Sequence, residues 1–208
     1  MRIGIVGSGM IGGTLGTLFA RAGHEVVLSN SRGPDSLREL VEGIGPNAQA
    51  LTVDEAASFG EVVLLAVPFR KPEALPPPDK VAGKVVIDAM NPYGEGGVMD
   101  LGDSTSSEET AKRLPGARVV KAFNTLHYKM LQDEGRPGAD LKDRLAVFLA
   151  GDDAETKAVV SKLIEEIGFA PIDAGSLREG GWRLEPGSPI YNAPLKGGEA
   201  QEAVSRLS

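Results

Sequence analysis

The sequence predicts an α/β fold in which a doubly wound parallel sheet is covered by helices, with a small α/β annex at the C-terminal end. Two observations support this class. Short runs such as residues 61–67 are apolar throughout, as strands covered on both faces are. They alternate with segments whose apolar residues recur at helical spacing. With 208 residues, 41% of them hydrophobic, the chain is long enough to bury such a core.

The first strand-to-helix turn is the segment around which this fold is organised. Residues 3–6 form an apolar strand, and the apolar residues that follow are spaced as on one face of a helix. Between them lies the pattern Gly-x-Gly-x-x-Gly, which consists of Gly7, Ser8, Gly9, Met10, Ile11 and Gly12. The first glycine permits a tight turn, the second lets backbone approach a pyrophosphate, and the third lets helix and strand pack closely. This context favours a Rossmann-type dinucleotide-binding turn over a glycine turn with a purely structural role.

The stretch after the second predicted strand, residues 25–28, indicates which dinucleotide is bound. An NAD-binding fold has Asp or Glu here, roughly 20 residues beyond the glycines, to hydrogen-bond the ribose 2′-hydroxyl. This chain has Ser29, Asn30, Ser31 and Arg32 instead. A carboxylate would repel a 2′-phosphate, whereas hydroxyl, amide and guanidinium groups can bind it, so we predict NADP(H). The alternative interpretation is an ordinary polar loop with a solvated arginine.

The remaining elements follow in the order expected of such a sheet. Strands are expected at 48–51, 61–67, 84–89, 118–123, 145–150 and 169–172, and helices within 35–44, from 52, from 106 and within 153–167. The proline-rich segment 72–78 leaves little room for a helix, and Ser106 with Glu109 has the spacing of a capping box. We expect residues 132–143 to form a mobile loop. Residues 180–198 should bury their apolar side chains against the body or a second subunit, and could close one wall of the site.

The carboxyl ends of parallel strands meet at the ligand crevice of a doubly wound sheet. Ala66, Val67 and Pro68 end a central strand there, and Asn91 follows the next strand. We therefore expect these four residues near the middle or the nicotinamide half of the cofactor. The amide of Asn91 could hold a ribose or carboxamide group, although a turn-forming asparagine before proline explains it equally well.

Composition excludes several classes of function. The balance of 22 Lys and Arg against 29 Asp and Glu gives a net charge of −7, which argues against nucleic-acid or membrane surfaces as partners. The chain has no cysteine and two histidines, so no metal site is expected. Glycines interrupt the N-terminal apolar run, so we expect neither a signal peptide nor a membrane span, and a cytoplasmic protein. We divide the chain into an NADP-binding domain, residues 1–128, and a small C-terminal segment, residues 129–208, packed on it as one unit.

The two histidines each have a structural and a catalytic interpretation. His24 lies in a helix-to-strand turn, at the wrong end of a parallel sheet for ligands, so we expect a polar residue at an exposed corner. His127 could relay a proton, or could be an ordinary histidine on a helix surface. The chain also has no Tyr-x-x-x-Lys pair. Because hydride exchange between conjugated rings needs little acid–base help, this favours transfer between two cofactors without a catalytic side chain.

Several motifs together resemble the coenzyme F-420 (8-hydroxy-5-deazaflavin)-dependent NADP oxidoreductase family. They are the glycine turn 7–12, the loop 29–34, Val67-Pro68, residues 119–125, and the segments 151–153 and 173–177. The resemblance implies reversible hydride transfer between C4 of nicotinamide and C5 of the deazaflavin. It also implies that Ser31 and Arg32 bind the 2′-phosphate and that residues 8–11 bind the pyrophosphate. The residues implied to border the stacked rings are Pro68, Asn91, Ala122 and Asn124.

Residues 121–125 also resemble the cytosolic domain of the STEAP metalloreductases, which pass hydride from NADPH to a flavin. On the acceptor side, Asn124 stands where archaeal deazaflavin enzymes carry a histidine. We expect an NADP(H)-dependent oxidoreductase, in the form of a homodimer, with coenzyme F-420 as second substrate. The alternatives are an NADPH-dependent flavin or ferric reductase that uses FMN or FAD, and, in another class, a non-catalytic NADP(H)-sensing module.

Overall fold

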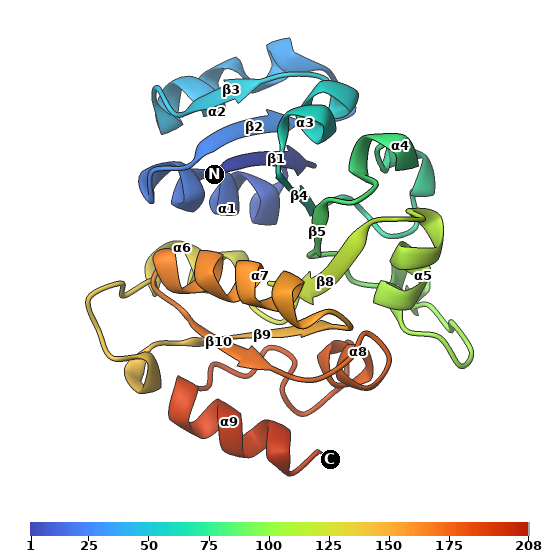
Figure 1. Cartoon of the computed structure of the whole chain (residues 1–208), viewed down its shortest axis with the longest axis vertical. Coiled ribbons are helices and arrows are strands. Elements are labelled where there is room, and N and C mark those ends of the chain that lie inside the picture. Colours follow the sequence, from blue (N-terminus) through green and yellow to red (C-terminus); the bar gives the residue numbers. More distant parts are fainter. Residues whose placement is uncertain (208) are drawn as a thin grey trace.

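The computed structural model describes residues 1–207, whose strands form one large sheet and one small hairpin (Figure 1). The strands are β1 (Arg2–Val6), β2 (Glu25–Ser29), β3 (Ala48–Ala50), β4 (Val62–Leu65), β5 (Val85–Asp88), β6 (Tyr93–Gly94), β7 (Gly97–Val98), β8 (Arg118–Ala122), β9 (Ala146–Gly151) and β10 (Ala170–Asp173). The helices are α1 (Met10–Arg21), α2 (Arg38–Ile44), α3 (Val53–Phe59), α4 (Pro78–Val81), α5 (Ser106–Arg113), α6 (Tyr128–Asp133), α7 (Ala154–Glu166), α8 (Glu179–Leu184) and α9 (Gly197–Ser205). Each strand expected from an apolar run is present, with its ends shifted by no more than about two residues, the usual uncertainty of such boundaries.

The large sheet has the strand order β10-β9-β8-β5-β4-β1-β2-β3. From β3 to β8 all neighbours pair in parallel, and the order reverses beside β1, which confirms the predicted doubly wound class. One local correction concerns β9, which pairs antiparallel to β8, with Ala122 opposite Leu149. The chain enters β9 beyond the carboxyl end of β8, so the intervening α6 is not a crossover helix. The annex itself is a βαβ unit, because β10 pairs parallel to β9 after α7.

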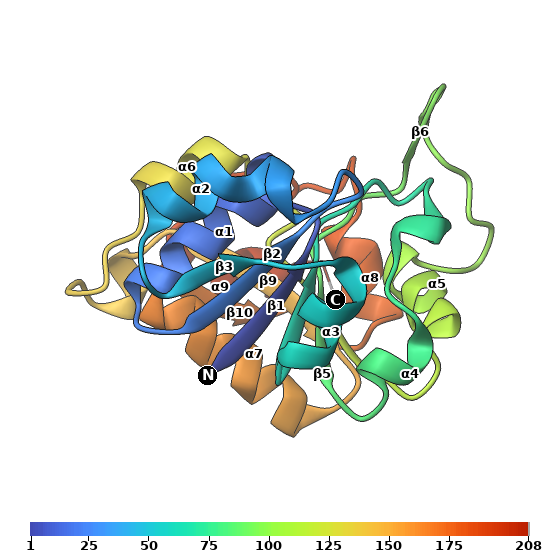
Figure 2. The same ribbon diagram turned by 90° about the horizontal axis from the view of Figure 1, so that it is seen from above.

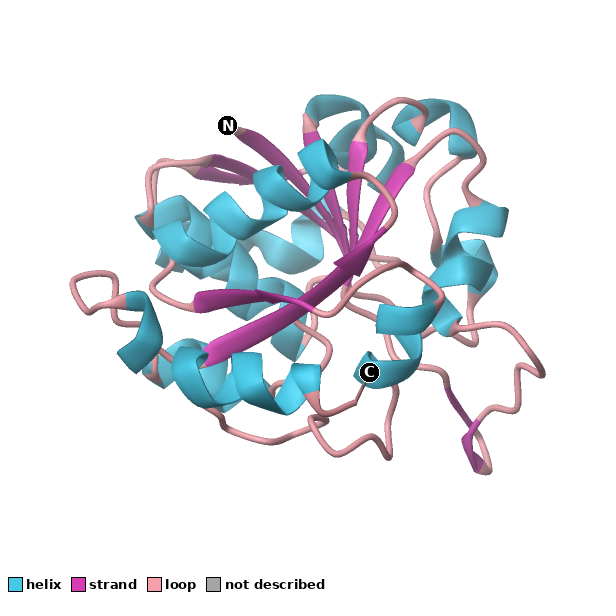
Figure 3. Ribbon diagram, turned by 60° about the horizontal axis from the view of Figure 1, so that its bottom comes forward, coloured by secondary structure: helices cyan, strands magenta, loops and turns pink. Residues whose placement is uncertain are grey.

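Helices cover both faces of the sheet. Phe19 of α1, Leu131 of α6 and Leu163 of α7 belong to one buried apolar cluster with the strands. On the other face, Ala57 of α3 and Val81 of α4 belong to a second cluster, and α8 and α9 cover β9 and β10 through a third. Figure 2 shows α1, α2 and α6 on one side and α3 on the other, and Figure 3 shows the β6–β7 hairpin projecting from the body. The carboxyl ends of the parallel strands are left for a ligand.

His24 is buried, which contradicts the expectation of an exposed corner. Its ring packs edge-on against Phe19, with the ring centroids 6.1 Å apart. Its Nδ1 lies 3.2 Å from the N-terminal nitrogen of Met1, and its Nε2 lies 3.0 Å from Oε2 of Glu166. Burial, reinforced by the N-terminal charge and opposed by Glu166, lowers the pKa of His24. The sequence places the residue correctly in its turn, but does not reveal that the end of α7 covers that turn.

The capping box of α5 begins one residue earlier than predicted. Thr105 is the N-cap: its hydroxyl accepts from the backbone N–H of Glu108, and its own N–H donates to Oε2 of Glu108 at 2.8 Å. Ser106 lies inside the helix, where its hydroxyl accepts from Nζ of Lys121 at 3.0 Å and donates to Oε1 of Glu185 at 2.7 Å. The side chain of Ser106 is therefore occupied by tertiary contacts.

The loop after α6 is anchored, where the sequence suggested a mobile segment. The guanidinium of Arg144 donates to the carbonyl oxygens of Pro137 at 2.6 Å, Ala139 at 2.9 Å and Glu165 at 2.9 Å. The backbone N–H of Arg136 donates to the carbonyl of Gly168 at 2.9 Å. Side chain and backbone thus tie residues 136–144 to the end of α7.

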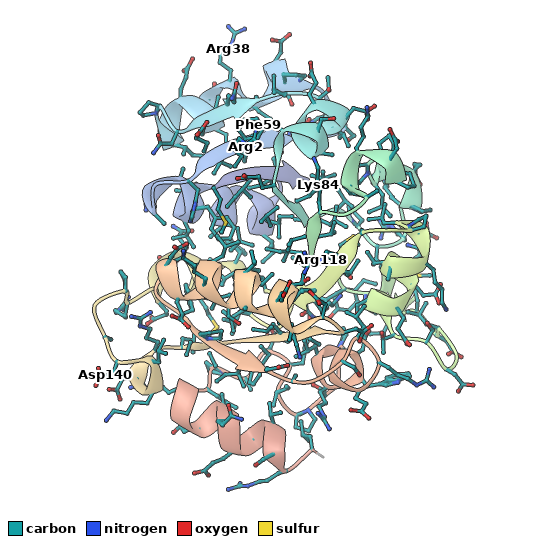
Figure 4. All side chains as sticks on the ribbon, viewed as in Figure 1. Arg2, Arg38, Phe59, Lys84, Arg118 and Asp140 are labelled. Carbon is teal, nitrogen blue, oxygen red and sulfur yellow. The ribbon has the colours of Figure 1, made fainter. Side chains whose placement is uncertain are left out.

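The segment 151–153 lies at the edge of the sheet opposite the crevice, because β9 runs antiparallel to its neighbour. Asp153 caps α7, and hydrogen bonds from Thr156 and Arg118 lower its pKa to about 2. Arg118 is labelled in Figure 4, at the start of β8 beside the first turn of α7. Oδ1 of Asp152 accepts from the N–H of Leu177 at 2.8 Å. These aspartates therefore hold the annex together.

Candidate functional site

The glycine turn leaves the N-terminus of α1 without a protein partner. Gly9 is the N-cap, no side chain caps the helix, and its first turn contains no acidic residue. The first intrahelical hydrogen bond runs from the N–H of Gly13 to the carbonyl of Gly9. The N–H groups at positions 10–12 are therefore available, together with the positive end of the helix dipole, for an anion.

The three glycines of the motif differ in what makes them necessary. Gly7 has φ of 101° and a Cβ there would overlap the carbonyl of Ala66, while a Cβ on Gly12 would overlap the carbonyl of Gly7. A Cβ on Gly9 would meet no protein atom within 4 Å. Packing of the chain therefore requires Gly7 and Gly12 but not Gly9. The missing side chain of Gly9 instead leaves room for a ligand that approaches the backbone.

The loop after β2 presents two side chains to solvent. Oδ1 of Asn30 accepts from the N–H of Arg32 at 2.9 Å, and Nδ2 of Asn30 donates to the hydroxyl of Ser36 at 3.0 Å. Ser36 in turn donates to the carbonyl of Gly33 at 2.7 Å. Asn30 thus organises the loop, while Ser31 and Arg32 are exposed. Ser36 was not singled out from the sequence, because its role depends on the fold of the loop.

Two predicted ligand residues are placed differently from expectation. Ser29 is fully buried, and its hydroxyl donates to the carbonyl of Ile5 at 2.8 Å, so it joins β1 to β2. Ala122 is fully buried in the cluster that contains α1. Neither side chain is open to the crevice, because residues of a central strand alternate between the two covered faces. Sequence position alone did not reveal which face each residue occupies.

An apolar pocket of about 500 Å³ adjoins the glycine turn at the carboxyl ends of β4 and β5. Its lining residues are Gly9, Met10, Ile11, Ala66, Val67, Pro68, Phe69, Arg70, Ala89, Met90, Asn91 and Tyr93. The predicted residues Ala66, Val67, Pro68 and Asn91 are all among them. Arg70 is the charged member of this lining, and the lining contains no Asp, Glu, His or Lys.

Asn91 and Asn124 are brought together by two hydrogen bonds. Nδ2 of Asn124 donates to Oδ1 of Asn91 at 3.0 Å, and Nδ2 of Asn91 donates to the carbonyl of Asn124 at 3.1 Å. The remaining proton of each amide goes to the C-terminal segment: Asn124 donates to the carbonyl of Leu184 at 2.8 Å, and Asn91 to the hydroxyl of Tyr191 at 3.1 Å. Leu184 and Tyr191 thus hold the two asparagines from behind, although neither residue is among those that line the pocket.

Residues 2–92 match the family described as NADP oxidoreductase, coenzyme F-420-dependent. This match covers 91 of the 208 residues of the chain, all of them in its N-terminal part. The chain is also 33% identical over 178 residues to Metalloreductase STEAP3 of Rattus norvegicus, a match that covers 85% of this chain and 34% of STEAP3. This chain therefore spans about a third of that relative.

Solved structures of other proteins have the same fold. The hypothetical protein SMa0349 from Sinorhizobium meliloti is 32% identical, with a TM-score of 0.82 over 94% of this chain and 95% of that one. A protein from Arthrobacter sp. FB24, whose name proposes an F-420-dependent NADP reductase, is 26% identical with a TM-score of 0.72, over 85% and 86%. A reductive aminase from Aspergillus terreus, in complex with NADPH, is 19% identical with a TM-score of 0.61, over 99% and 60%, and shares the fold.

A buried ion pair supports the backbone at the edge of the pocket. Nζ of Lys121 lies 3.3 Å from Oδ2 of Asp88, and both side chains are fully buried. Lys121 also donates to the carbonyl of Met90, whose N–H donates to Oδ1 of Asp88 at 2.9 Å. The pair thus fixes the backbone immediately before Asn91. Its signal in the sequence is a lysine within an otherwise apolar strand.

The other groups considered from the sequence lie outside this pocket. His127 is exposed and caps α6, with Nδ1 accepting from the N–H of Lys129 at 3.4 Å, which favours its structural interpretation. Among residues 1–207, no three His, Cys, Asp or Glu side chains form a group that could hold a metal ion. Within the same residues, no helix has the length and apolar character needed to cross a membrane.

Proposed function

We propose that this chain transfers hydride between NADP(H) and the deazaflavin ring of coenzyme F-420. The observation that carries the proposal is the position of the apolar pocket, which begins at the uncapped glycine turn and contains no acid–base side chain of the Asp, Glu, His or Lys type. A largely apolar pocket of about 500 Å³ has room for a flat conjugated ring. The match of residues 2–92 to the NADP oxidoreductase family supports the NADP(H) half of this proposal.

The residues present fit NADP(H) at its pyrophosphate, at its 2′-phosphate and at its nicotinamide end. The free N–H groups at 10–12 would hold the pyrophosphate, for which Gly9 leaves space. Ser31 and Arg32 would hold the 2′-phosphate, because a guanidinium matches phosphate geometry with paired donors. Pro68 and Asn91 would border the nicotinamide end.

In this proposal the protein contributes to hydride transfer by positioning the two rings. NADPH, when bound, would supply the hydride, and the chain would orient the donor and acceptor rings against the apolar pocket. The hydrogen bonds between Asn91 and Asn124 fix the pocket edge, and Lys121 fixes the backbone before it. No catalytic acid or base is assigned.

Two acceptors have support of different kinds. The name of the matching family and that of the Arthrobacter protein favour the deazaflavin. The 33% identity to STEAP3, a metalloreductase, favours the alternative of an NADPH-dependent flavin or ferric reductase. A third function, NADP(H) sensing without turnover, would use the same phosphate-binding residues.

A direct assay separates the three. The protein is mixed with NADPH and either oxidised coenzyme F-420 or FMN, and the visible absorption band of the acceptor is followed, while NADPH binding is measured separately by fluorescence. Loss of the deazaflavin band supports the proposal, and reduction of FMN alone transfers it to the flavin alternative. NADPH binding without reduction of either acceptor would contradict both and favour the sensor.

A further inference from the structure

Two tyrosines that have no place in the NADP(H) half form a pair at the edge of the pocket. The hydroxyl oxygens of Tyr93 and Tyr191 lie 3.0 Å apart. The hydroxyl of Tyr191 also accepts a hydrogen bond from Nδ2 of Asn91 at 3.1 Å. Tyr93 begins the β6–β7 hairpin and lines the pocket, whereas Tyr191 comes from the segment that follows α8. The pair therefore joins two distant parts of the chain beside the nicotinamide end of the crevice.

Counting hydrogens shows that this pair has one donor to spare. The amide nitrogen of Asn91 can only donate, so it uses a lone pair of the Tyr191 hydroxyl and none of the phenolic hydrogens. Two hydroxyls carry two hydrogens, and one of these is used between Tyr93 and Tyr191. Within the described residues, neither hydroxyl has another hydrogen-bond acceptor. One O–H group is therefore left for a ligand.

The O–H group without an acceptor is assigned to Tyr93. If Tyr191 donates to Tyr93, the free O–H is that of Tyr93, whose side chain is 43% exposed and faces the pocket. The reverse direction would leave an unpaired O–H on the half-buried Tyr191, which costs free energy. Burial, followed by the hydrogen bond with Tyr93, raises the pKa of Tyr191. Tyr191 thus stays protonated. Its hydroxyl accepts a hydrogen bond from Asn91 and donates one to Tyr93.

The backbone has a left-handed conformation on both sides of this network. Among residues 1–207, the non-glycine residues with positive φ are Phe123, at 67°, and Asn192, at 55°. Phe123 directly precedes Asn124, which holds Asn91, and Asn192 directly follows Tyr191. Positive φ in a bulky, buried residue such as Phe123 is unfavourable and persists where the surrounding structure imposes it, often at functional sites. Phe123 therefore holds backbone strain directly beside the asparagine–tyrosine network, whereas asparagine adopts the left-handed conformation readily.

We infer that Tyr93, oriented by Tyr191, donates a hydrogen bond to the hydride acceptor and selects acceptors with a carbonyl oxygen or nitrogen in a conjugated ring. This inference rests on the proposed hydride transfer. In that step the C4–H bond of NADPH breaks, and its proton and two electrons form a new bond on the acceptor ring. NADPH is oxidised to NADP⁺, and the reduced acceptor gains negative charge that spreads to its ring carbonyl or nitrogen. The phenol stabilises that charge, and solvent water later supplies the proton that neutralises it.

The test uses the three tyrosines of the chain. Tyr93→Phe removes the donor, Tyr191→Phe removes the group that orients it, and Tyr128→Phe, on α6, is the matched control. The first readout is equilibrium binding of oxidised FMN, by quenching of its fluorescence, in the presence of NADP⁺. The second is single-turnover oxidation of NADPH by FMN and by coenzyme F-420. Binding of NADPH alone and thermal unfolding show whether each variant is intact.

We expect Tyr93→Phe to slow hydride transfer roughly tenfold or more, the usual effect of losing a hydrogen bond to a developing charge, with NADPH binding unchanged. Tyr191→Phe should give a smaller loss in the same direction, and Tyr128→Phe none. A rate for Tyr93→Phe equal to that of the unaltered protein would overturn the inference and leave the proposed function standing. If the unaltered protein reduces neither acceptor, the proposed function fails. In that case, weaker FMN binding by Tyr93→Phe supports the donor role, and unchanged or absent binding overturns it.

Discussion

Replacing Arg32 by alanine tests the NADP(H) assignment at its most specific point. The side chain of Arg32 is exposed and makes no hydrogen bond or ion pair with the described residues, while Asn30 fixes its backbone. Its loss should therefore leave the loop folded and remove the contact with the 2′-phosphate alone. A charge-assisted hydrogen bond contributes about 1.5–3 kcal/mol, and solvent exposure places this one near the lower end. We expect the dissociation constant of NADPH to rise roughly 10- to 30-fold.

The comparison with NADH makes the measurement decisive. NADH lacks the 2′-phosphate, so its affinity should change less than about twofold in Arg32→Ala, as measured by fluorescence titration at fixed ionic strength. Arg206→Ala is the matched control, because Arg206 is also exposed, pairs with Glu202 at 3.2 Å, and lies at the end of α9. Its loss removes the same charge without touching the crevice. Equal losses for NADPH and NADH, or no loss for either, would refute the reasoning.

Further predictions concern packing and charge. Gly9→Ala should weaken NADPH binding at least tenfold while changing the free energy of unfolding by less than about 1 kcal/mol, whereas Gly43→Ala, equally open to solvent, should leave binding unchanged. Lys121→Met should lower the free energy of unfolding by about 3–5 kcal/mol in denaturant titrations, because it leaves the charge of Asp88 buried and unpaired, and Asp88→Asn in the same chain should restore part of it. The lowered pKa of His24 means that the unfolded chain binds its proton first, so stability should fall as pH drops below about 6.5. In His24→Gln the free energy of unfolding should depend less on pH below about 6.5. An equally steep dependence on pH in this variant would contradict the lowered pKa of His24.

The fold could be predicted from the sequence because its signals are local. Apolar runs identified every strand of the large sheet, and the Gly7–Gly12 pattern identified the turn that faces the crevice. The direction of β9 could not be predicted in this way, since parallel and antiparallel strands that are buried on both faces have the same apolar pattern. The expected mobility of the loop at 132–143 likewise took no account of Arg144, whose hydrogen bonds depend on the docking of α7.

In the candidate site, too, some residues could be located from the sequence and others depend on the tertiary fold. Pro68 and Asn91 come three residues after β4 and β5 and line the pocket at the carboxyl ends of these strands, which is where residues after a parallel strand are expected. The side chains of Ser29 and Ala122 are buried instead, because a shift of one residue along a strand reverses the face. The tyrosine pair could not be found from spacing, since Tyr191 reaches Asn91 only through the path of the last segment.

The contact between Asn91 and Tyr191 also has a consequence for the order in which the site is completed. During synthesis the glycine turn and the Arg32 loop leave the ribosome long before residues 184–192 exist. The glycine turn and the Arg32 loop can therefore form before the contact of Asn91 with Tyr191, which requires residues 184–192. Cleavage or displacement of these late residues would remove partners of Asn91 and Asn124 while leaving the glycine turn in place.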